Sequence, residues 1–186
     1  MALPTVKLTA AVKHRIFAAL IGAGVGIPSA YVATELTVPS ESIVLAPHAD
    51  PVGLQTICIG HLVKKGEVVK PRYTLEECIE IFVQDWKSHE AMLDKVVKVP
   101  YASPWMKAAL TDFTINKGIG NVSSSTLLKK LNSKEYNETC EQLSRWVYAG
   151  GKILPGLVIR ASKQYKYCMG EVPGDYIPTI KRWTTE

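Results

Sequence analysis

The chain has 186 residues and a formal net charge of +5, and 47% of its residues are hydrophobic. This length fits a single domain with an adequate core. The positive charge suits an anionic polymer, either nucleic acid or bacterial cell wall, and charge alone does not separate the two. The sequence has no RNA- or DNA-binding motif and no stripe of interleaved basic and aromatic residues. We therefore expect no nucleic-acid partner and favour the cell wall.

The first feature along the chain is an uncharged run of eighteen residues, Ile16–Ala33, which follows the basic residues Lys7, Lys13, His14 and Arg15. Its length is at the lower limit for a membrane-spanning helix, which needs ~20 apolar residues. Its glycines, alanines and Pro28 make it only weakly hydrophobic. The basic flank predicts that the N-terminus stays in the cytoplasm, as for a weak membrane anchor.

Two other interpretations of this run remain open. One is a cleavable signal peptide, because a basic region precedes an apolar one. However, the possible cleavage points after Ala30 and Ala33 have a proline or a tyrosine where a small residue should stand, so we favour a retained segment. The other is a buried core helix, which the density of glycine and proline disfavours.

The next stretch places Glu41, Asp50 and Thr56 within sixteen residues. Pro47 and Pro51 interrupt it, so a helix can hold Glu41 but cannot continue to Asp50. The short β-branched segment from Thr56 to Ile59 indicates a hairpin strand. A helix end, a turn and a hairpin can thus bring an acid, a carboxylate and a hydroxyl around one cleft. Two carboxyls on either side of a bond are what glycoside hydrolysis requires.

Helices are predicted for most of the remaining chain. Thr74 as N-cap and Glu77 at the capping-box position begin a helix that continues to about Val97. Trp105–Asn116 predicts the central helix of the domain, which ends at Gly118–Asn121. Further helices are expected over Ser123–Asn132, Tyr136–Ala149 and Leu157–Met169, and the tail from Gly170 reads as a surface extension. The pattern indicates an α+β fold, with a small hairpin lobe, a larger helical lobe and a cleft between them.

The four cysteines match no zinc-binding pattern, because there is no CxxC pair and no cluster of histidines. An even number of cysteines in an exported chain indicates disulfides, for which three connectivities are possible. We favour Cys58–Cys78 and Cys140–Cys168, since each pair joins neighbouring elements. The alternative is four buried free thiols.

Several of these segments together resemble the phage-type lysozymes, glycoside hydrolase family 24. The motif of that family is filled by Glu41, Asp50, Thr56, Gly60 and His61. Further similarity, in part to lambdoid-phage endolysins, lies in Tyr73–Cys78, Ile115–Gly120, Ser125–Lys130 and Arg145–Lys152, so the resemblance covers about Pro39 to Met169. Two positions depart from the family: Ser42 replaces a glycine, and His48 replaces an aromatic residue.

The resemblance implies roles for individual residues. Glu41 would be the general acid, which requires partial burial. Asp50 would stabilise the oxocarbenium-like state or help to orient water, and Thr56 would position the attacking water, which implies inversion. Substrate would contact Leu62, Ile115 and Asn116. His61 and Trp146 are expected to be structural, the role of His48 is unassigned, and no cofactor or metal is expected. Taken singly, Glu41 is equally explained as a charge at a helix N-terminus, Asp50 as a turn residue and Thr56 as a strand former.

A weak anchor before a lysozyme domain is similar to the signal-anchor-release endolysins. These lyse the host by cleaving the β-1,4 bond between N-acetylmuramic acid and N-acetylglucosamine. The resemblance implies export by the host secretion machinery, tethering to the periplasmic face of the inner membrane, and release of a monomer to the periplasm. The expected division is an anchor segment over 1–34, a catalytic domain over 35–170 and an extension over 171–186. The rival interpretation is a catalytically idle, tethered peptidoglycan-binding protein.

Overall fold

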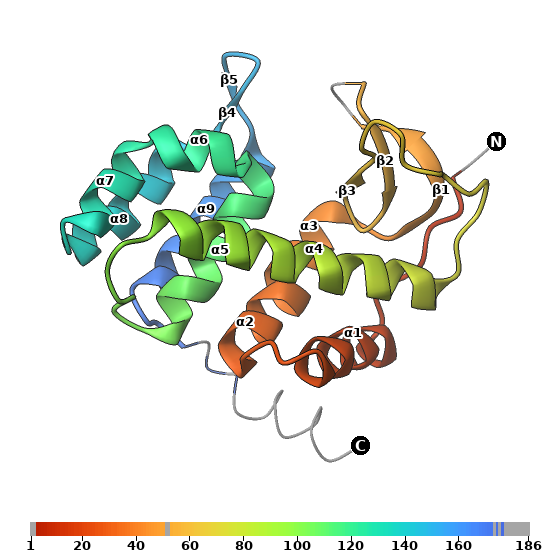
Figure 1. The fold of residues 1–186 in the computed structure, drawn as a ribbon, viewed down its shortest axis with the longest axis horizontal. Helices are drawn as coiled ribbons and strands as arrows, with labels where there is room; N and C mark the ends of the chain where they lie inside the picture. Colours follow the sequence, from red (N-terminus) through yellow and green to blue (C-terminus); the bar gives the residue numbers. More distant parts are fainter. Residues whose placement is uncertain (1–2, 51–52, 173, 175, 177–186) are drawn as a thin grey trace.

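The structure is a computed structural model that describes residues 3–50, 53–172, 174 and 176. Figure 1 shows a small antiparallel sheet at one end of the molecule and a larger group of helices at the other, with helix α4 (Leu75–Val96) running along both. The predicted α+β architecture, with a hairpin lobe and a helical lobe, is confirmed.

The N-terminal run forms two helices, α1 (Ala10–Gly22) and α2 (Ile27–Val32), separated by a turn in which Gly24 has φ +84°. Ile16, Phe17 and Leu20 are buried in the main core. The prediction that glycine and proline disfavour a buried core helix is therefore wrong: the glycines divide the run in two, and each half is covered by neighbouring helices. Among the described residues, none of the helices is both long enough and apolar enough to cross a membrane.

Helix α2 continues without a break through a π-helical segment, η1 (Ala33–Thr37), into α3 (Val38–Glu41). The Val38 N–H donates to the Ala33 carbonyl, five residues back, which is the hydrogen bond that defines a π-turn. The helix ends at Glu41 because Ser42 has φ +64°. Glu41 thus lies at the C-terminal end of its helix, and the interpretation of it as an N-terminal helix charge is wrong.

The small lobe is a three-stranded antiparallel sheet in the order β1 (Val44–Ala49), β2 (Gln55–Cys58) and β3 (His61–Leu62). The strand expected at Thr56 is confirmed as β2. Strand β1 tolerates Pro47 because it forms the outer edge of this sheet, where a ladder N–H is dispensable. Thr5 pairs with Val44, so residues near the N-terminus extend this edge.

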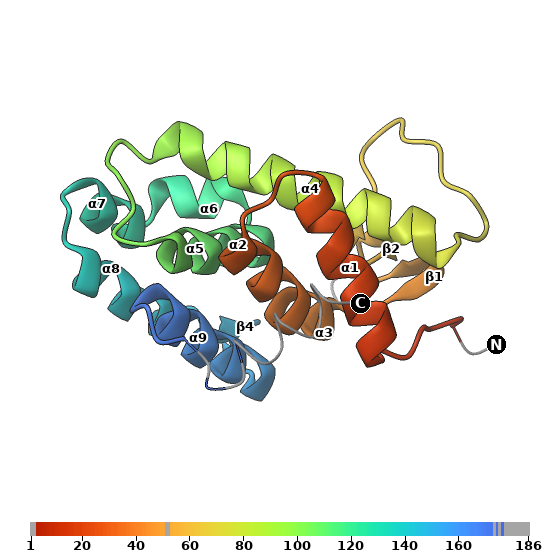
Figure 2. The same cartoon turned by 90° about the horizontal axis from the view of Figure 1, so that it is seen from below.

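In the helical lobe, the capping box of Thr74 and Glu77 opens α4 as predicted. The central helix is α5 (Pro104–Lys117), which is buried on all sides over Ala108–Thr114 and lies beside α9 (Pro155–Cys168) in both views (Figures 1 and 2). Three further helices, α6 (Ile119–Ser124), α7 (Thr126–Asn132) and α8 (Tyr136–Glu141), close the end of the lobe.

Two predicted helices differ from the structure. The one expected over Ser123–Asn132 begins separately at Thr126, because Ser125 is extended and caps it, and α6 precedes it. The one expected over Tyr136–Ala149 ends early: Gln142–Arg145 is a 3₁₀ turn, and β4 (Tyr148–Ala149) pairs with β5 (Lys152–Ile153) around the two glycines, Gly150 and Gly151. Paired glycines at positive φ favour this hairpin over a helix.

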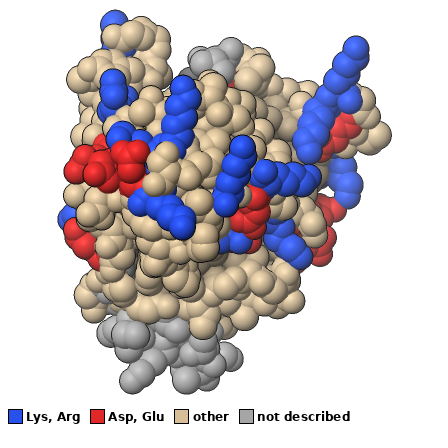
Figure 3. All heavy atoms as spheres, turned by 60° about the vertical axis from the view of Figure 1, so that its left-hand side comes forward, with Lys and Arg blue, Asp and Glu red and all other residues tan. Residues whose placement is uncertain are grey.

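Both expected disulfides are present, and they join the elements that were predicted to be neighbours. Cys58–Cys78 links β2 to α4, and Cys140–Cys168 links α8 to α9. Most of the expected C-terminal extension lies outside the described residues. Tyr176, which is described, packs its ring against Tyr31 and Trp105. On the face in Figure 3, basic and acidic side chains lie intermixed.

Candidate active site

Glu41 lies where the helix from the N-terminal run meets the sheet, and its side chain is 26% exposed. The turn between β2 and β3 touches it through Gly60, which has φ +70°. A Cβ atom added to Gly60 would lie 2.9 Å from Glu41 Oε2. Glycine is therefore needed at this position both for the backbone conformation and for the close approach to the carboxyl.

We expect Gly60→Ala to lower activity, because the new methyl group displaces the Glu41 carboxyl, and to lower the free energy of unfolding by about 1–2 kcal/mol through the left-handed backbone. Gly66→Ala is the matched control: Gly66 has φ +86°, but nothing lies within 4 Å of its added Cβ. It should cost similar stability and keep activity. Cell-wall turnover and thermal unfolding of both variants test this, and equal activity losses would contradict it.

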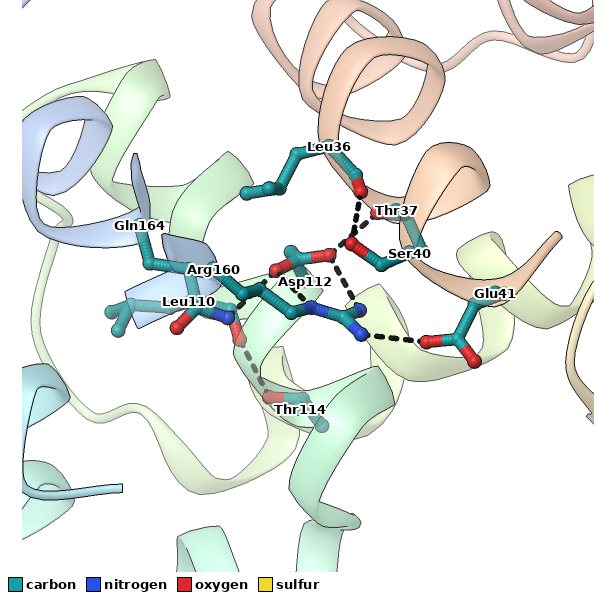
Figure 4. A network of polar contacts seen from close by, with 9 residues as sticks. All are labelled: Leu36, Thr37, Ser40, Glu41, Leu110, Asp112, Thr114, Arg160 and Gln164. Carbon is teal, nitrogen blue, oxygen red and sulfur yellow. Dashed lines mark hydrogen bonds and ion pairs between the residues drawn. The ribbon is translucent and has the colours of Figure 1, made fainter. Parts of the chain in front are cut away.

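Behind Glu41 lies a network of charged side chains on three elements (Figure 4). The guanidinium of Arg160 on α9 donates from Nη1 to Glu41 Oε1 at 2.6 Å. It also donates from Nε and Nη2 to the two oxygens of Asp112 on α5, at 3.1 and 2.9 Å. Asp112 accepts two more hydrogen bonds, from Thr37 Oγ1 and Gln164 Nε2, each at 2.6 Å.

Every member of this network behind Glu41 is buried: Asp112 is 0% exposed and Arg160 5%. Burial by itself lowers the pKa of Arg160, but the charges and hydrogen bonds of Asp112 and Glu41 outweigh it, so the pKa is raised. Neither Asp112 nor Arg160 was predicted from the sequence. The available signal was the charged residue Asp112 within the largely apolar stretch Ala108–Phe113, because a carboxylate is rarely buried without a partner.

A groove of about 670 Å³ runs between the Glu41 helix and α9. Glu41 and the predicted substrate residue Asn116 line the same groove, together with Arg160 and Lys163. Ile115, its predicted neighbour, is half-buried and packs against the core. The structure therefore brings the proposed acid and one predicted substrate contact to one surface.

The other predicted residues lie on the sheet. Thr56 is buried and pairs across the ladder with both His48 and the exposed Leu62, so the three side chains share one face. The His48 ring Nδ1–H donates to the Ala46 carbonyl at 3.2 Å. Asp50 lies in the β1–β2 turn, where its carboxylate accepts the Leu54 N–H at 2.8 Å. The turn role foreseen for Asp50 is thus real.

His61, which begins β3, lies between two carboxylates. Its Nδ1 lies 2.7 Å from Asp85 on α4, and its Nε2 lies 3.0 Å from Glu67 in the following loop. The hydrogen bond to Asp85 raises the pKa of His61, and the contact with Glu67 adds to this against the effect of burial. The pKa of Glu67 is lowered, chiefly by the backbone N–H of Lys64 and further by His61.

A histidine whose folded pKa is raised binds its proton more tightly in the folded state than in the unfolded state. Its contribution to stability is therefore complete below about pH 6.5 and is lost as the pH rises through the folded pKa. We expect the melting temperature to fall over this range in the wild type and to fall less in His61→Gln. Thermal unfolding from pH 5.5 to 9 tests this, and parallel curves for the two proteins would contradict it.

The chain is similar to several known proteins in sequence and in fold. Residues 39–164 match the family model for phage lysozyme. The chain is 38% identical over 120 residues to a SAR-endolysin of Escherichia phage Mu, which covers 64% of this chain and 68% of the relative. It is 31% identical over 169 residues to a SAR-endolysin of Bacteriophage PS34, covering 87% and 96%. The active form of the P1 phage endolysin Lyz shares the fold, with a TM-score of 0.72 at 20% identity over 92% of this chain and 99% of that one.

Proposed function

The chain belongs to the phage lysozyme family and is a glycoside hydrolase of the lysozyme type, and on that basis we propose that it is an N-acetylmuramidase. It hydrolyses the β-1,4 bond between N-acetylmuramic acid and N-acetylglucosamine in peptidoglycan and so lyses the host cell. The observation that carries the proposal is the partly buried Glu41, which lines the groove with Asn116 and is held by Arg160.

In this mechanism Glu41 protonates the glycosidic oxygen as the bond breaks, because the leaving sugar is a poor leaving group without a proton. Asp50, on the opposite lobe, supports the positive charge that develops on the sugar. The Thr56 hydroxyl, on the sheet face shared with Leu62, orients the water that attacks. Attack by water from the far face inverts the anomeric centre.

Analysis of the soluble products identifies the bond. Purified Gram-negative peptidoglycan is digested, and the fragments are separated by chromatography. Their masses are measured by mass spectrometry before and after borohydride reduction. A muramidase leaves reducible N-acetylmuramic acid ends. Reducible N-acetylglucosamine ends, or anhydro-muramic ends, would refute the assignment. The anomeric configuration of the fresh end, followed by NMR, tests inversion.

The second candidate is an idle, tethered protein that binds peptidoglycan without turnover, and it rests on Ser42 and His48. Ser42 has φ +64°, a conformation that glycine adopts without strain, and it lies directly after the acid. Chloroform-treated Gram-negative cells separate the candidates. Clearing supports the enzyme, whereas sedimentation of the protein with intact walls supports the binder.

The proposal includes a membrane-anchored state before lysis. It is supported by the uncharged run Ile16–Ala33 after a basic flank and by the relatives that are called SAR-endolysins. Export through the host secretion machinery would leave the chain at the periplasmic side of the inner membrane, and release would deliver a monomer to the periplasm. In the folded enzyme Ile16, Phe17 and Leu20 belong to the core. Anchoring therefore requires a second arrangement of residues 1–34, in which these side chains face lipid.

Two glycines allow this anchored state to be tested without damaging the fold. Gly22 and Gly26 are exposed, with nothing within 4 Å of an added Cβ, whereas Gly24 has φ +84° and should be left unchanged. Gly22→Leu with Gly26→Leu should hold the protein in the membrane fraction and delay lysis. The matched serine pair should not. If the leucine protein is as soluble as the wild type and lacks its first thirty or so residues by mass, a cleaved signal peptide replaces the anchor.

A further inference from the structure

We propose that Arg160 divides its charge between Glu41 and Asp112, and that this division sets the upper pH limit at which the enzyme works. Asp112 is then a positioning residue for the reaction, although it does not reach the groove. The inference rests on the proposed role of Glu41 as the proton donor, and it adds the residues that regulate that role.

The geometry assigns each guanidinium nitrogen a partner. Asp112 takes Nε and Nη2 as a two-point pair, which fixes the plane of the guanidinium, and only Nη1 is directed to Glu41 (Figure 4). Asp112 is itself fixed by Thr37 on η1 and Gln164 on α9, so both of its oxygens are fully used. The contacts with Asp112 are therefore sufficient to orient the Arg160 side chain, whether or not Glu41 is present.

The charges explain why the division matters. An acid that must give up a proton works poorly beside an undivided positive charge, since that charge favours its ionised form. Asp112 is buried, and its negative charge is not screened by solvent, so it offsets much of the effect of Arg160 at Glu41. Arg160 therefore holds Glu41 by a short hydrogen bond, while Asp112 offsets part of the positive charge that would otherwise favour the ionised form of Glu41.

Other charged groups surround this network. Lys163 and Glu35 line the same groove, and Lys117 lies at the end of α5. Burial lowers the pKa of Lys117, and the charge of Arg160 lowers it further, so Lys117 lies within the electrostatic reach of Arg160. From the sheet lobe, Gly60 approaches Glu41, and the next residue, His61, is paired with Asp85 and Glu67. His48 and Asp50 lie further along the same sheet, opposite Thr56 and in the β1–β2 turn. All of these are more exposed than Asp112, so solvent screens their influence more strongly.

A purely structural role gives a different expectation. If the network only fastened α3, α5 and α9 together, any change in it would lower stability and activity without moving the pH profile. Charge division instead makes opposite predictions for its two partners. Arg160→Gln removes the cation, so the alkaline limb of kcat/KM, which reports loss of the proton donor, moves up by about 1 unit or more. Asp112→Asn removes the opposing charge at nearly constant shape, so the limb moves down.

Two variants separate charge from shape. Arg160→Lys keeps the cation but loses the planar fork, so its alkaline limb should lie much closer to that of the wild type than to that of Arg160→Gln, with a lower rate. Thr37→Val removes one hydrogen bond to Asp112 and no charge, so it should leave the limb in place. The matched charge controls are Lys130→Gln and Glu135→Gln, which alter an exposed ion pair on α7 and the turn before α8. Neither should move the limb.

The decisive measurement does not depend on turnover. Carboxyl-carbon NMR of labelled protein, with the Glu41 signal assigned by Glu41→Gln, gives the titration midpoint of that side chain in each folded variant. Midpoints displaced upward in Arg160→Gln and downward in Asp112→Asn support the inference, whatever the lysis assay shows. Midpoints that do not move, or that move in the same direction, overturn it. Failure of the product analysis on peptidoglycan would instead overturn the muramidase assignment. If Asp112→Asn does not fold, Arg160→Gln against Arg160→Lys decides alone: equal midpoints in these two overturn the inference.

Discussion

Glu41→Gln protein is expected to hydrolyse peptidoglycan about 10²–10⁴-fold more slowly than the wild type while remaining folded. An amide cannot give the glycosidic oxygen the proton that it needs, and general acid catalysis contributes a factor of this size. The fold should survive because the glutamine carbonyl can still accept the Nη1–H of Arg160, and the bidentate pair with Asp112 is untouched. Turbidity loss of treated cells and thermal unfolding measure the two effects separately.

The control for this variant is Glu138→Gln, which neutralises an exposed carboxyl on α8. It should clear cells at the wild-type rate. Clearing by Glu41→Gln at that rate would show that another residue is the acid. Unfolding of Glu41→Gln at a much lower temperature would show that the Arg160 contact, rather than the chemistry, is what Glu41 supplies.

Reduction of both disulfides is expected to cause the largest loss of stability. The two bridges close chain segments of 20 and 28 residues. Loop-closure entropy assigns each bridge about 3 kcal/mol, so together they account for a large part of the ~5–15 kcal/mol that stabilises a typical domain. The melting temperature should fall by roughly 10–20 °C with reductant, given the size of the chain.

Single-bridge variants divide this loss. Cys58→Ala with Cys78→Ala frees the sheet from α4, and Cys140→Ala with Cys168→Ala frees α8 from α9. Without reductant, each double variant should show about half of the fall in melting temperature that full reduction causes. Addition of reductant should then cause only the other half. Calorimetry with and without reductant provides the values. Four free thiols by titration in protein matured under oxidising conditions would contradict the pairing.

The elements around the proposed catalytic residues could be predicted because the signals for them are local in the sequence. Pro47 and Pro51 exclude one helix that holds both Glu41 and Asp50, and the β-branched residues around Thr56 favour a strand, so the order of elements follows from short-range rules. The structure adds a strand, β1, that these rules did not indicate, since Pro47 argues against a strand unless it lies at an edge.

The network behind the acid could not be predicted in the same way. Arg160 lies 119 residues from Glu41, and Asp112 lies 48 residues from Arg160. Nothing local joins them, and only the packing of α3, α5 and α9 brings them together. The prediction that the run Ile16–Ala33 does not form a buried helix was wrong for a related reason. Its glycines lower helix propensity, but burial of Ile16, Phe17 and Leu20 in the core outweighs propensity, which is a weak preference.

The π-turn at Ala33–Thr37 has a consequence for which changes this helix can tolerate. Each residue of an α-helix advances the chain by about 100° around the helix axis, so one extra residue in a turn rotates everything beyond it by that angle. Tyr31 and Val32, before the π-turn, face the core, and Glu41, after it, faces Arg160. The angle around the helix axis between these two faces is therefore set by the number of residues in the π-turn. A single deletion there would leave each side chain chemically intact but aim the carboxyl about a quarter-turn away from its cation. Substitutions along this helix should therefore be tolerated far more often than changes in its length.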